Sequence, residues 1–181
     1  MNPDLTRLTG LLPRPQDRGR IPDWNAAEST LQTSLPADYK ELVEAYGGGG
    51  FIDGYLLFLE PGCRNGVYDL LKITREREEA NDSLWQFEGK PTELEAEGTR
   101  LICWATTDNG EYLYWLVGQG DDPDTRPILV NDESGEHWER YDMTVTRFLV
   151  GELGGEVRSQ ILWGEFPQPV HEFRTATAMA D

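Results

Sequence analysis

The sequence predicts an α+β fold, with a mixed, mostly antiparallel sheet of about five or six strands and helices packed against one side of it. Three observations favour this class. A helical pattern over residues 35–46 ends in four glycines, two aromatic runs flank an Asn-Gly pair, and another helical pattern follows the last predicted strand. Helices and strands that follow one another in this irregular order are typical of α+β proteins.

The helix after Leu35 has a defined start and a defined end. Pro36 suits a first helical turn, and its proline ring disfavours helix in the residue before it. The apolar stripe of this helix consists of Tyr39, Leu42, Val43 and Tyr46. Gly47 begins the glycine run that ends the helix, and we predict a positive φ at Gly47 or Gly49. A phosphate-binding loop is disfavoured because such loops follow a strand, whereas this run follows a helix.

Three further helices are predicted from caps and spacing. Asp23 is the N-cap of a helix from Trp24 to about Leu31, and Thr144 is the N-cap of a helix that ends before two glycines. A third helix, capped by Thr74, is expected between these two. Its narrow apolar stripe comprises Ile73, Arg77, Ala80, Leu84 and Phe87.

Short extended segments account for the sheet. They are residues 51–52, 55–59, 101–106, 112–117, 127–130 and 137–141. Asn109-Gly110 lies between the third and the fourth segment. This dipeptide is a strong hairpin signal, because a type I′ turn needs positive φ at both central residues. We therefore predict a tight turn that joins two paired strands, one with Trp104 and the other with Trp115.

The length of 181 residues suits one domain with a sizeable core, which we place at residues 21–166. Residues 1–20 contain four arginines, two aspartates and three prolines, a composition that predicts a loosely attached arm. Alternatively, four leucines form a short helical turn on the body; they are Leu5, Leu8, Leu11 and Leu12. Residues 167–181 are expected to form a C-terminal tail with a frayed end. Ahead of this tail, Ile161, Leu162, Trp163 and Phe166 are expected to pack back on the sheet.

The net charge of −17 argues against nucleic-acid binding, which needs a cationic surface. It is compatible with a basic protein partner, whose encounter opposite charge accelerates, and also with acidity that serves solubility alone. Residues 76–97 and residues 121–142 each contain eight acidic residues and two basic ones. If these segments flank the same face, they form an electronegative patch.

Catalytic and metal-binding motifs are poor in this sequence. The two histidines, His137 and His171, lie in a predicted strand and in the tail, and Cys63 and Cys103 are too far apart for a metal-binding pair. An aspartate-rich loop lacks the spacing and the final glutamate of a calcium-binding EF-hand. We expect no enzymatic activity, no metal and no cofactor. No apolar run is long enough to span a membrane, and without a signal segment we expect a cytoplasmic protein.

The helix after Leu35 and the hairpin at Asn109-Gly110 together contain the residues of a family resemblance. A leucine-proline pair, an acidic-aromatic pair, a short helix and the pattern Tyr-Gly-x-Gly-x-Phe follow one another without a gap. The matching positions are Leu35, Pro36, Asp38, Tyr39, Tyr46, Gly47, Gly49 and Phe51, with Trp104, Gly110 and Trp115 as a second block. Over about residues 24–153 the chain resembles the SUKH superfamily, which includes fungal cell-wall-assembly regulators and bacterial immunity proteins against secreted toxins.

The resemblance implies the same α+β fold and a protein partner. With the acidity, it implies an immunity protein that binds and neutralises a cognate toxin, for which we expect a basic, nuclease-type domain. The expected partner-binding residues are Asp121, Asp122, Asp124, Glu133 and Glu136, and the acidic face from Glu76 to Asp82 is the competing site. The alternative function is an intracellular regulatory or scaffold domain. The sequence leaves the oligomeric state open.

Overall fold

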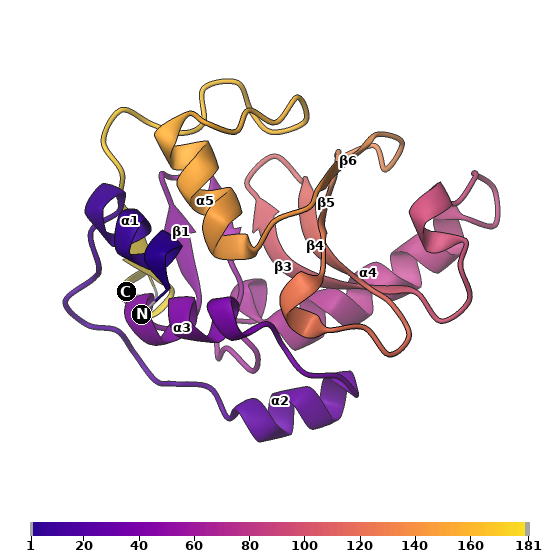
Figure 1. The fold of residues 1–181 in the computed structure, drawn as a ribbon, viewed down its shortest axis with the longest axis horizontal. Coiled ribbons are helices and arrows are strands. Elements are labelled where there is room, and N and C mark those ends of the chain that lie inside the picture. Colours follow the sequence, from indigo (N-terminus) through magenta and orange to yellow (C-terminus); the bar gives the residue numbers. More distant parts are fainter. Residues whose placement is uncertain (1, 180–181) are drawn as a thin grey trace.

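The computed structural model describes residues 2–179 and is built around one seven-stranded sheet (Figure 1). The strand order is β6-β5-β4-β3-β2-β1-β7, and each neighbouring pair is antiparallel. The strands are β1 (Gly50–Ile52), β2 (Leu56–Phe58), β3 (Arg100–Thr107), β4 (Tyr112–Val117), β5 (Ile128–Asn131), β6 (Trp138–Tyr141) and β7 (Phe173–Thr175). The α+β class is confirmed, with slightly more strands than expected.

Helices cover both faces of the sheet, so the expectation that they lie on one side is wrong. They are α1 (Pro3–Leu11), α2 (Trp24–Leu31), α3 (Ala37–Tyr46), α4 (Leu70–Leu84) and α5 (Val145–Gly154). Tyr114 and Trp115 are neighbours in β4 and therefore point to opposite faces. The Trp115 ring meets Tyr39 of α3 edge-on at 4.9 Å, whereas the Tyr114 hydroxyl contacts Arg77 of α4. Helix α4 thus lies on the face of the sheet opposite α3.

The main core lies between the sheet and helices α1, α3 and α5. Trp104 and Trp115 are fully buried there, and Trp104 packs against Phe148 of α5 with a centroid distance of 6.0 Å. The Tyr39 hydroxyl donates a hydrogen bond of 2.6 Å to the Leu59 carbonyl, which satisfies a polar group at the centre of this core. The motif residues Tyr39, Trp104 and Trp115 therefore serve to pack this core.

The N-terminal segment adopts the helical alternative that the sequence left open. Helix α1 contacts α5 and α3, and Leu5, Leu8 and Leu12 are buried in the main core. The Tyr46 hydroxyl donates to the Leu12 carbonyl at 2.6 Å, and Arg7 forms an ion pair with Glu156 at 2.5 Å. Residues 3–12 are consequently part of the packed body.

The glycine run ends α3 and also lets other segments of the chain approach closely. Gly47 has φ 85° and ψ 172°, a region essentially restricted to glycine, and Gly49 has φ 54°, so the predicted positive φ is confirmed at both. A Cβ on Gly47 would lie 1.8 Å from the Arg18 carbonyl oxygen, and one on Gly50 would lie 2.2 Å from the Phe173 ring. The run therefore has the structural role that its position after a helix indicated.

Tight turns join β3 to β4 and β1 to β2, and the first of these differs in type from the prediction. Asn109-Gly110 joins the paired strands β3 and β4 as predicted, but Gly110 alone has positive φ, so the turn is not type I′. A positive φ at both central residues occurs instead at Asp53 (51°) and Gly54 (66°), between β1 and β2. Asp-Gly, like Asn-Gly, is a sequence typical of type I′ turns.

Asp53 links this turn to the C-terminal segment. Its buried carboxylate accepts hydrogen bonds from the backbone amides of Gln168 (3.1 Å) and Glu172 (2.9 Å) and contacts Nδ1 of His171 at 2.8 Å. The segment then continues as β7, which pairs with β1 and was not predicted. Residues 180–181, where fraying was expected, lie outside the described residues.

The stretch before this segment packs on the body as predicted. Leu162 and Phe166 are buried, and the Phe166 ring lies 5.0 Å from that of Tyr55. Trp163 also contacts Tyr55 but keeps 42% of its surface exposed. Ile161 is partly buried against the core.

Helix α4 is present, but its cap and its buried face differ from the prediction. Asp69 is the N-cap, and Thr74 lies inside the helix, where its hydroxyl oxygen accepts a 3.1 Å hydrogen bond from the Cys103 amide. The buried positions include Thr74 and Asn81, whereas Ala80 is exposed and Phe87 lies beyond the helix end with 89% of its surface exposed. A polar face can be buried here because hydrogen bonds from neighbouring groups satisfy it.

Candidate functional site

The structure separates the five expected partner-binding acids into two groups, one in the loop at each end of strand β5. Asp121, Asp122 and Asp124 lie in the loop between β4 and β5, whereas Glu133 and Glu136 lie in the next loop, between β5 and β6. Strand β5 has four residues and so separates the two loops by about 13 Å. The five residues do not form one patch.

The three aspartates of the first group form hydrogen bonds or ion pairs with other residues of the same chain. Asp121 forms a bidentate ion pair with Arg126, with both distances 2.9 Å, and the Arg126 side chain is only 1% exposed. Arg126 also donates to the Ser34 carbonyl and to the Thr33 hydroxyl. Hydrogen bonding from Arg126 lowers the pKa of Asp121, which favours its charged form. This pair connects the loop to the segment before α3.

Asp124 caps a helix that is remote in sequence. Its carboxylate accepts a 2.7 Å hydrogen bond from the Ala37 amide at the N-terminus of α3, where Pro36 offers no side-chain cap. Asp122 accepts from the Asp124 amide and caps the short 3₁₀ helix η3 (Pro123–Thr125). A carboxylate at a helix N-terminus stabilises it through both the hydrogen bond and the dipole. Sequence reasoning missed this role because the capped helix lies 87 residues away.

The second group, Glu133 and Glu136, is exposed to solvent. Their carboxylates have no hydrogen-bond or ion-pair partner among the described residues. Their loop is held by Asp132, which contacts Nδ1 of His137 at 2.6 Å and accepts from the Ser134 hydroxyl. The hydrogen bond to Asp132 raises the pKa of His137. His137 thus stabilises the turn that presents the two glutamates.

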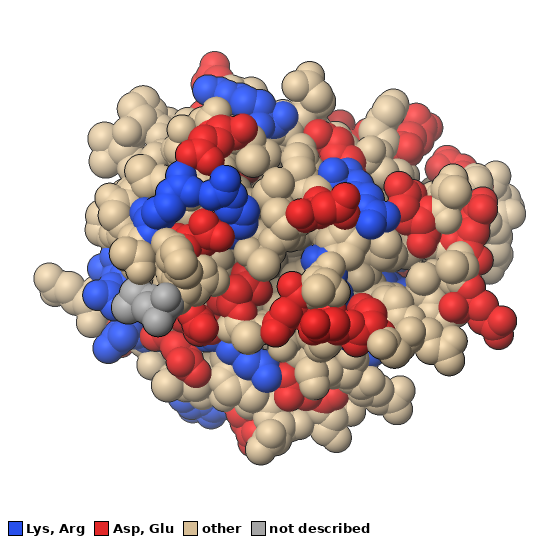
Figure 2. Space-filling model, viewed as in Figure 1, with Lys and Arg blue, Asp and Glu red and all other residues tan. Residues whose placement is uncertain are grey.

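Further free acids surround the C-terminal end of α4. Of the eight acidic residues between positions 76 and 97, Glu76 alone forms an ion pair within the described part of the chain, with Lys72 at 3.8 Å. The other seven are Glu78, Glu79, Asp82, Glu88, Glu93, Glu95 and Glu97. Figure 2 shows acidic side chains gathered at the right of the molecule, where α4 ends in Figure 1. The competing site named from the sequence therefore carries more unpaired charge than the loop at Asp121.

The two free acidic segments meet at a groove. Residues 88–91 line one wall and residues 135–138 the other, around a hollow of about 250 Å³ that includes Glu88, Glu136 and Trp138. Exposed Phe87 lies beside Glu88 in the chain. We name Phe87, Glu88, Glu133 and Glu136 the acidic edge. Exposed aromatic side chains surrounded by charge are typical of protein-binding sites.

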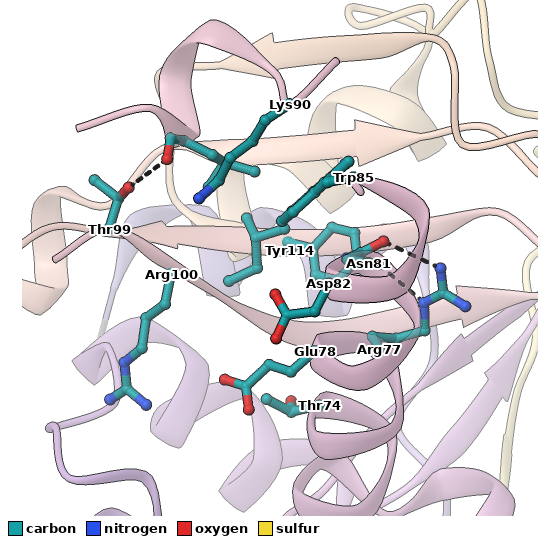
Figure 3. Close-up of a pocket in the computed structure, with 12 residues that line it drawn as sticks. Thr74, Arg77, Glu78, Asn81, Asp82, Trp85, Lys90, Thr99, Arg100 and Tyr114 are labelled. Carbon is teal, nitrogen blue, oxygen red and sulfur yellow. Dashed lines mark hydrogen bonds between the residues drawn. The ribbon is translucent and has the colours of Figure 1, made fainter. Parts of the chain in front are cut away.

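A second hollow, of about 190 Å³, lies on the other side of the 85–91 segment, between α4 and the start of β3 (Figure 3). Glu78 and Asp82 point into it from α4, and its other lining residues include Trp85, Lys90 and Tyr114. Burial raises the pKa of Glu78. The Lys90 ammonium lies 5.4 Å from the centre of the Trp85 ring, in cation–π contact.

The groups required for covalent catalysis do not converge in the described residues. His137 and His171 each contact an aspartate, and the nearby Ser134 hydroxyl donates to Asp132 and not to the imidazole. Burial raises the pKa of the Cys63 and Cys103 thiols to about 12, so both are protonated at neutral pH. No group of three or more metal-binding side chains occurs among residues 2–179.

The fold and this surface define an α+β domain with a central antiparallel sheet and an acidic, aromatic edge suited to protein contacts. The family model described as SMI1-KNR4 cell-wall matches residues 22–149, and the chain belongs to this family of the SUKH superfamily. The matched region runs from just before α2 into α5 and includes the glycine run and the acidic edge. No curated protein and no solved structure matches the chain significantly. Within the described part of the chain, every helix is too short or too polar to cross a membrane.

Proposed function

We propose that this protein is a non-enzymatic, cytoplasmic immunity protein that binds a basic toxin domain and neutralises it. The observation that supports this function most directly is the acidic edge, where Phe87 is 89% exposed beside carboxylates that have no partner in the described chain. Family membership supports a protein-binding role, since immunity proteins are among the members of the superfamily.

The acidity of the edge fits the chemistry of a nuclease-type partner. A protein that binds nucleic acid must itself be basic, and an inhibitor can present carboxylates to the same basic surface. The chain carries a net charge of −17, which attracts such a partner over the Debye length of about 10 Å at 0.1 M salt. Phe87 then supplies the apolar contact that slows dissociation, because buried aromatic side chains dominate binding energy in protein interfaces.

The test first looks for an open reading frame next to this gene that encodes a basic toxin domain, and then uses that domain in a binding and protection experiment. The triple variant Glu88→Gln/Glu133→Gln/Glu136→Gln should lower the association rate at least about tenfold at low salt, with little change in stability. A matched control neutralises three exposed acids elsewhere, Glu41, Glu44 and Glu165, and should associate much faster. Full protection of cells by the triple variant, or equal rates for both variants, would contradict the proposed surface.

Phe87 provides an independent test of the apolar contact. Phe87→Ser should weaken binding by about 1–3 kcal/mol through faster dissociation, while the free energy of unfolding stays within about 0.5 kcal/mol of the unchanged protein. The matched control is Val170→Ser, because Val170 is 82% exposed and lies in the C-terminal segment. If Phe87→Ser and Val170→Ser dissociate at the same rate, Phe87 is not part of the interface.

A further inference from the structure

We infer that the pocket between α4 and β3 in Figure 3 is an anchor site for an arginine side chain of the protein partner. The identity of the partner rests on the proposed function, whereas the guanidinium chemistry of the pocket rests on its own side chains. The pocket and the acidic edge share the 85–91 segment, so one partner surface can reach both.

Two carboxylates face into the pocket without a partner. Glu78 and Asp82 are four residues apart on α4, so they lie on the same face of the helix, and Figure 3 shows both pointing into the hollow. Neither makes a hydrogen bond or an ion pair within residues 2–179. Burial raises the pKa of Glu78 and the charge of Asp82 raises it further, and a cation that enters between the two carboxylates would relieve their repulsion. A guanidinium can donate to both at once because its five N–H groups form a planar fork.

The indole of Trp85 supplies a surface on which a cation can stack. Lys90 already occupies part of this surface, with its ammonium 5.4 Å from the ring centre and with no carboxylate partner among the described residues. This internal lysine shows that a cation is accepted against the indole at the mouth of the pocket. A guanidinium is the better occupant, because it is planar, less strongly hydrated than an ammonium, and able to stack while it pairs with carboxylates.

The two arginines of the pocket wall are committed elsewhere. Arg77 donates to the Tyr114 hydroxyl (3.3 Å) and to Asn81 (3.4 Å), and its guanidinium lies 4.0 Å from the centre of the Tyr112 ring. Arg100 donates to the Leu31 carbonyl. Its charge opposes the rise that burial causes in the pKa of Glu78, but it forms no ion pair with Glu78 or Asp82 within the described residues. Neither arginine therefore neutralises Glu78 or Asp82 by direct contact.

The hollow is large enough for the proposed occupant. Its volume of about 190 Å³ far exceeds the roughly 15 Å³ that one water molecule requires, so a guanidinium with its last methylene groups fits. The opening between α4 and residues 90–99 lets a side chain enter from solvent. A side chain inserted here would hold the partner in one register against the acidic edge.

The test uses N-acetyl-L-arginine methylamide as the probe and the full chain as the receptor. Titration at constant ionic strength, followed by the Trp85 indole N–H resonance, should give a saturable shift with a millimolar dissociation constant. Glu78→Gln/Asp82→Asn should weaken this binding at least about tenfold, whereas Glu76→Gln/Glu79→Gln, on the same helix but outside the pocket, should leave it unchanged. Shifts that do not saturate, or equal affinities for the two double variants, would overturn the inference.

Lys90 and the lysine derivative provide two further measurements. Lys90→Ala vacates the indole surface and should tighten probe binding several-fold; weaker binding to this variant would contradict a cation site. N-acetyl-L-lysine methylamide should bind more weakly than the arginine probe, and equal affinity would overturn the assignment to a guanidinium. No toxin is used, so a failure of the pocket is distinguishable from a failure of the proposed function, which the protection experiment tests.

Discussion

Replacement of Glu152 by glutamine should remove a specific pH dependence of stability. Glu152 is in α5, is 3% exposed, and accepts a 3.0 Å hydrogen bond from the Ser159 amide. Burial raises its pKa from 4.5 to about 7, and nearby Glu139 raises it further while Arg158 opposes the increase. Tyr141 is the other titratable group facing it, and it is protonated in this range.

The magnitude follows from the two pKa values. Because the folded-state pKa lies above the unfolded one, the group's contribution to stability is fully present below about pH 4.5 and is lost as the pH rises through 7. The difference of about 2.5 pH units corresponds to about 3 kcal/mol. Glu152→Gln keeps the side-chain oxygen that accepts from Ser159 and cannot ionise. The variant should nearly match the unchanged protein near pH 4, and its free energy of unfolding should exceed that of the unchanged protein by about 1 kcal/mol at pH 5 and about 3 kcal/mol near pH 8.

The assay is urea unfolding of both proteins at pH 5, 6, 7 and 8. The contribution of other titrating groups is common to both and cancels in the difference. Glu165→Gln serves as a control, because Glu165 is exposed and should leave the pH profile unchanged. Parallel profiles for Glu152→Gln and the unchanged protein would refute the argument that a buried carboxylate ionises in this range.

Three further predictions concern stability: two replace glycines, and one removes a helix cap. Gly47→Ala should lower the free energy of unfolding by more than about 2 kcal/mol, because φ 85° is strained for alanine and its Cβ would meet the Arg18 carbonyl. Gly10→Ala, in open space within α1, should stabilise by up to about 1 kcal/mol, and thermal unfolding measures both. Asp124→Ala should cost about 1 kcal/mol by uncapping the Ala37 amide of α3, so an unchanged unfolding midpoint would show that water replaces this cap.

Local signals predicted most of the fold. The caps at Asp23 and Thr144 and the stop at Gly47 are chemical signals carried by a few adjacent residues, and each element they define is present. Helix α4 shows where such signals fail. Its buried face contains Thr74, which accepts from the Cys103 amide of β3, and Asn81, which accepts from Arg77 of the same helix. No helical periodicity of apolar residues reveals either position. Strand β7 is likewise visible only through its pairing with β1.

The candidate site was harder to predict than the fold because composition does not distinguish paired from unpaired charge. Asp121 and Glu136 belong to equally acidic stretches, but Asp121 is bound to a buried arginine and Glu136 faces solvent. The distinction depends on contacts between segments far apart in sequence. The groove between Glu88 and Glu136 has the same origin, since it forms where the end of α4 meets the turn before β6.

The pairing of β7 with β1 has a consequence for the order in which the sheet can assemble during synthesis. Because β7 (Phe173–Thr175) follows the six other strands in the chain, it is synthesised after them. Until it is available, β1 has an open edge, Gly50 lacks the ring of Phe173, and the Asp53 carboxylate lacks its donors. A nascent chain arrested before Phe173 would therefore expose an unpaired strand to its neighbours.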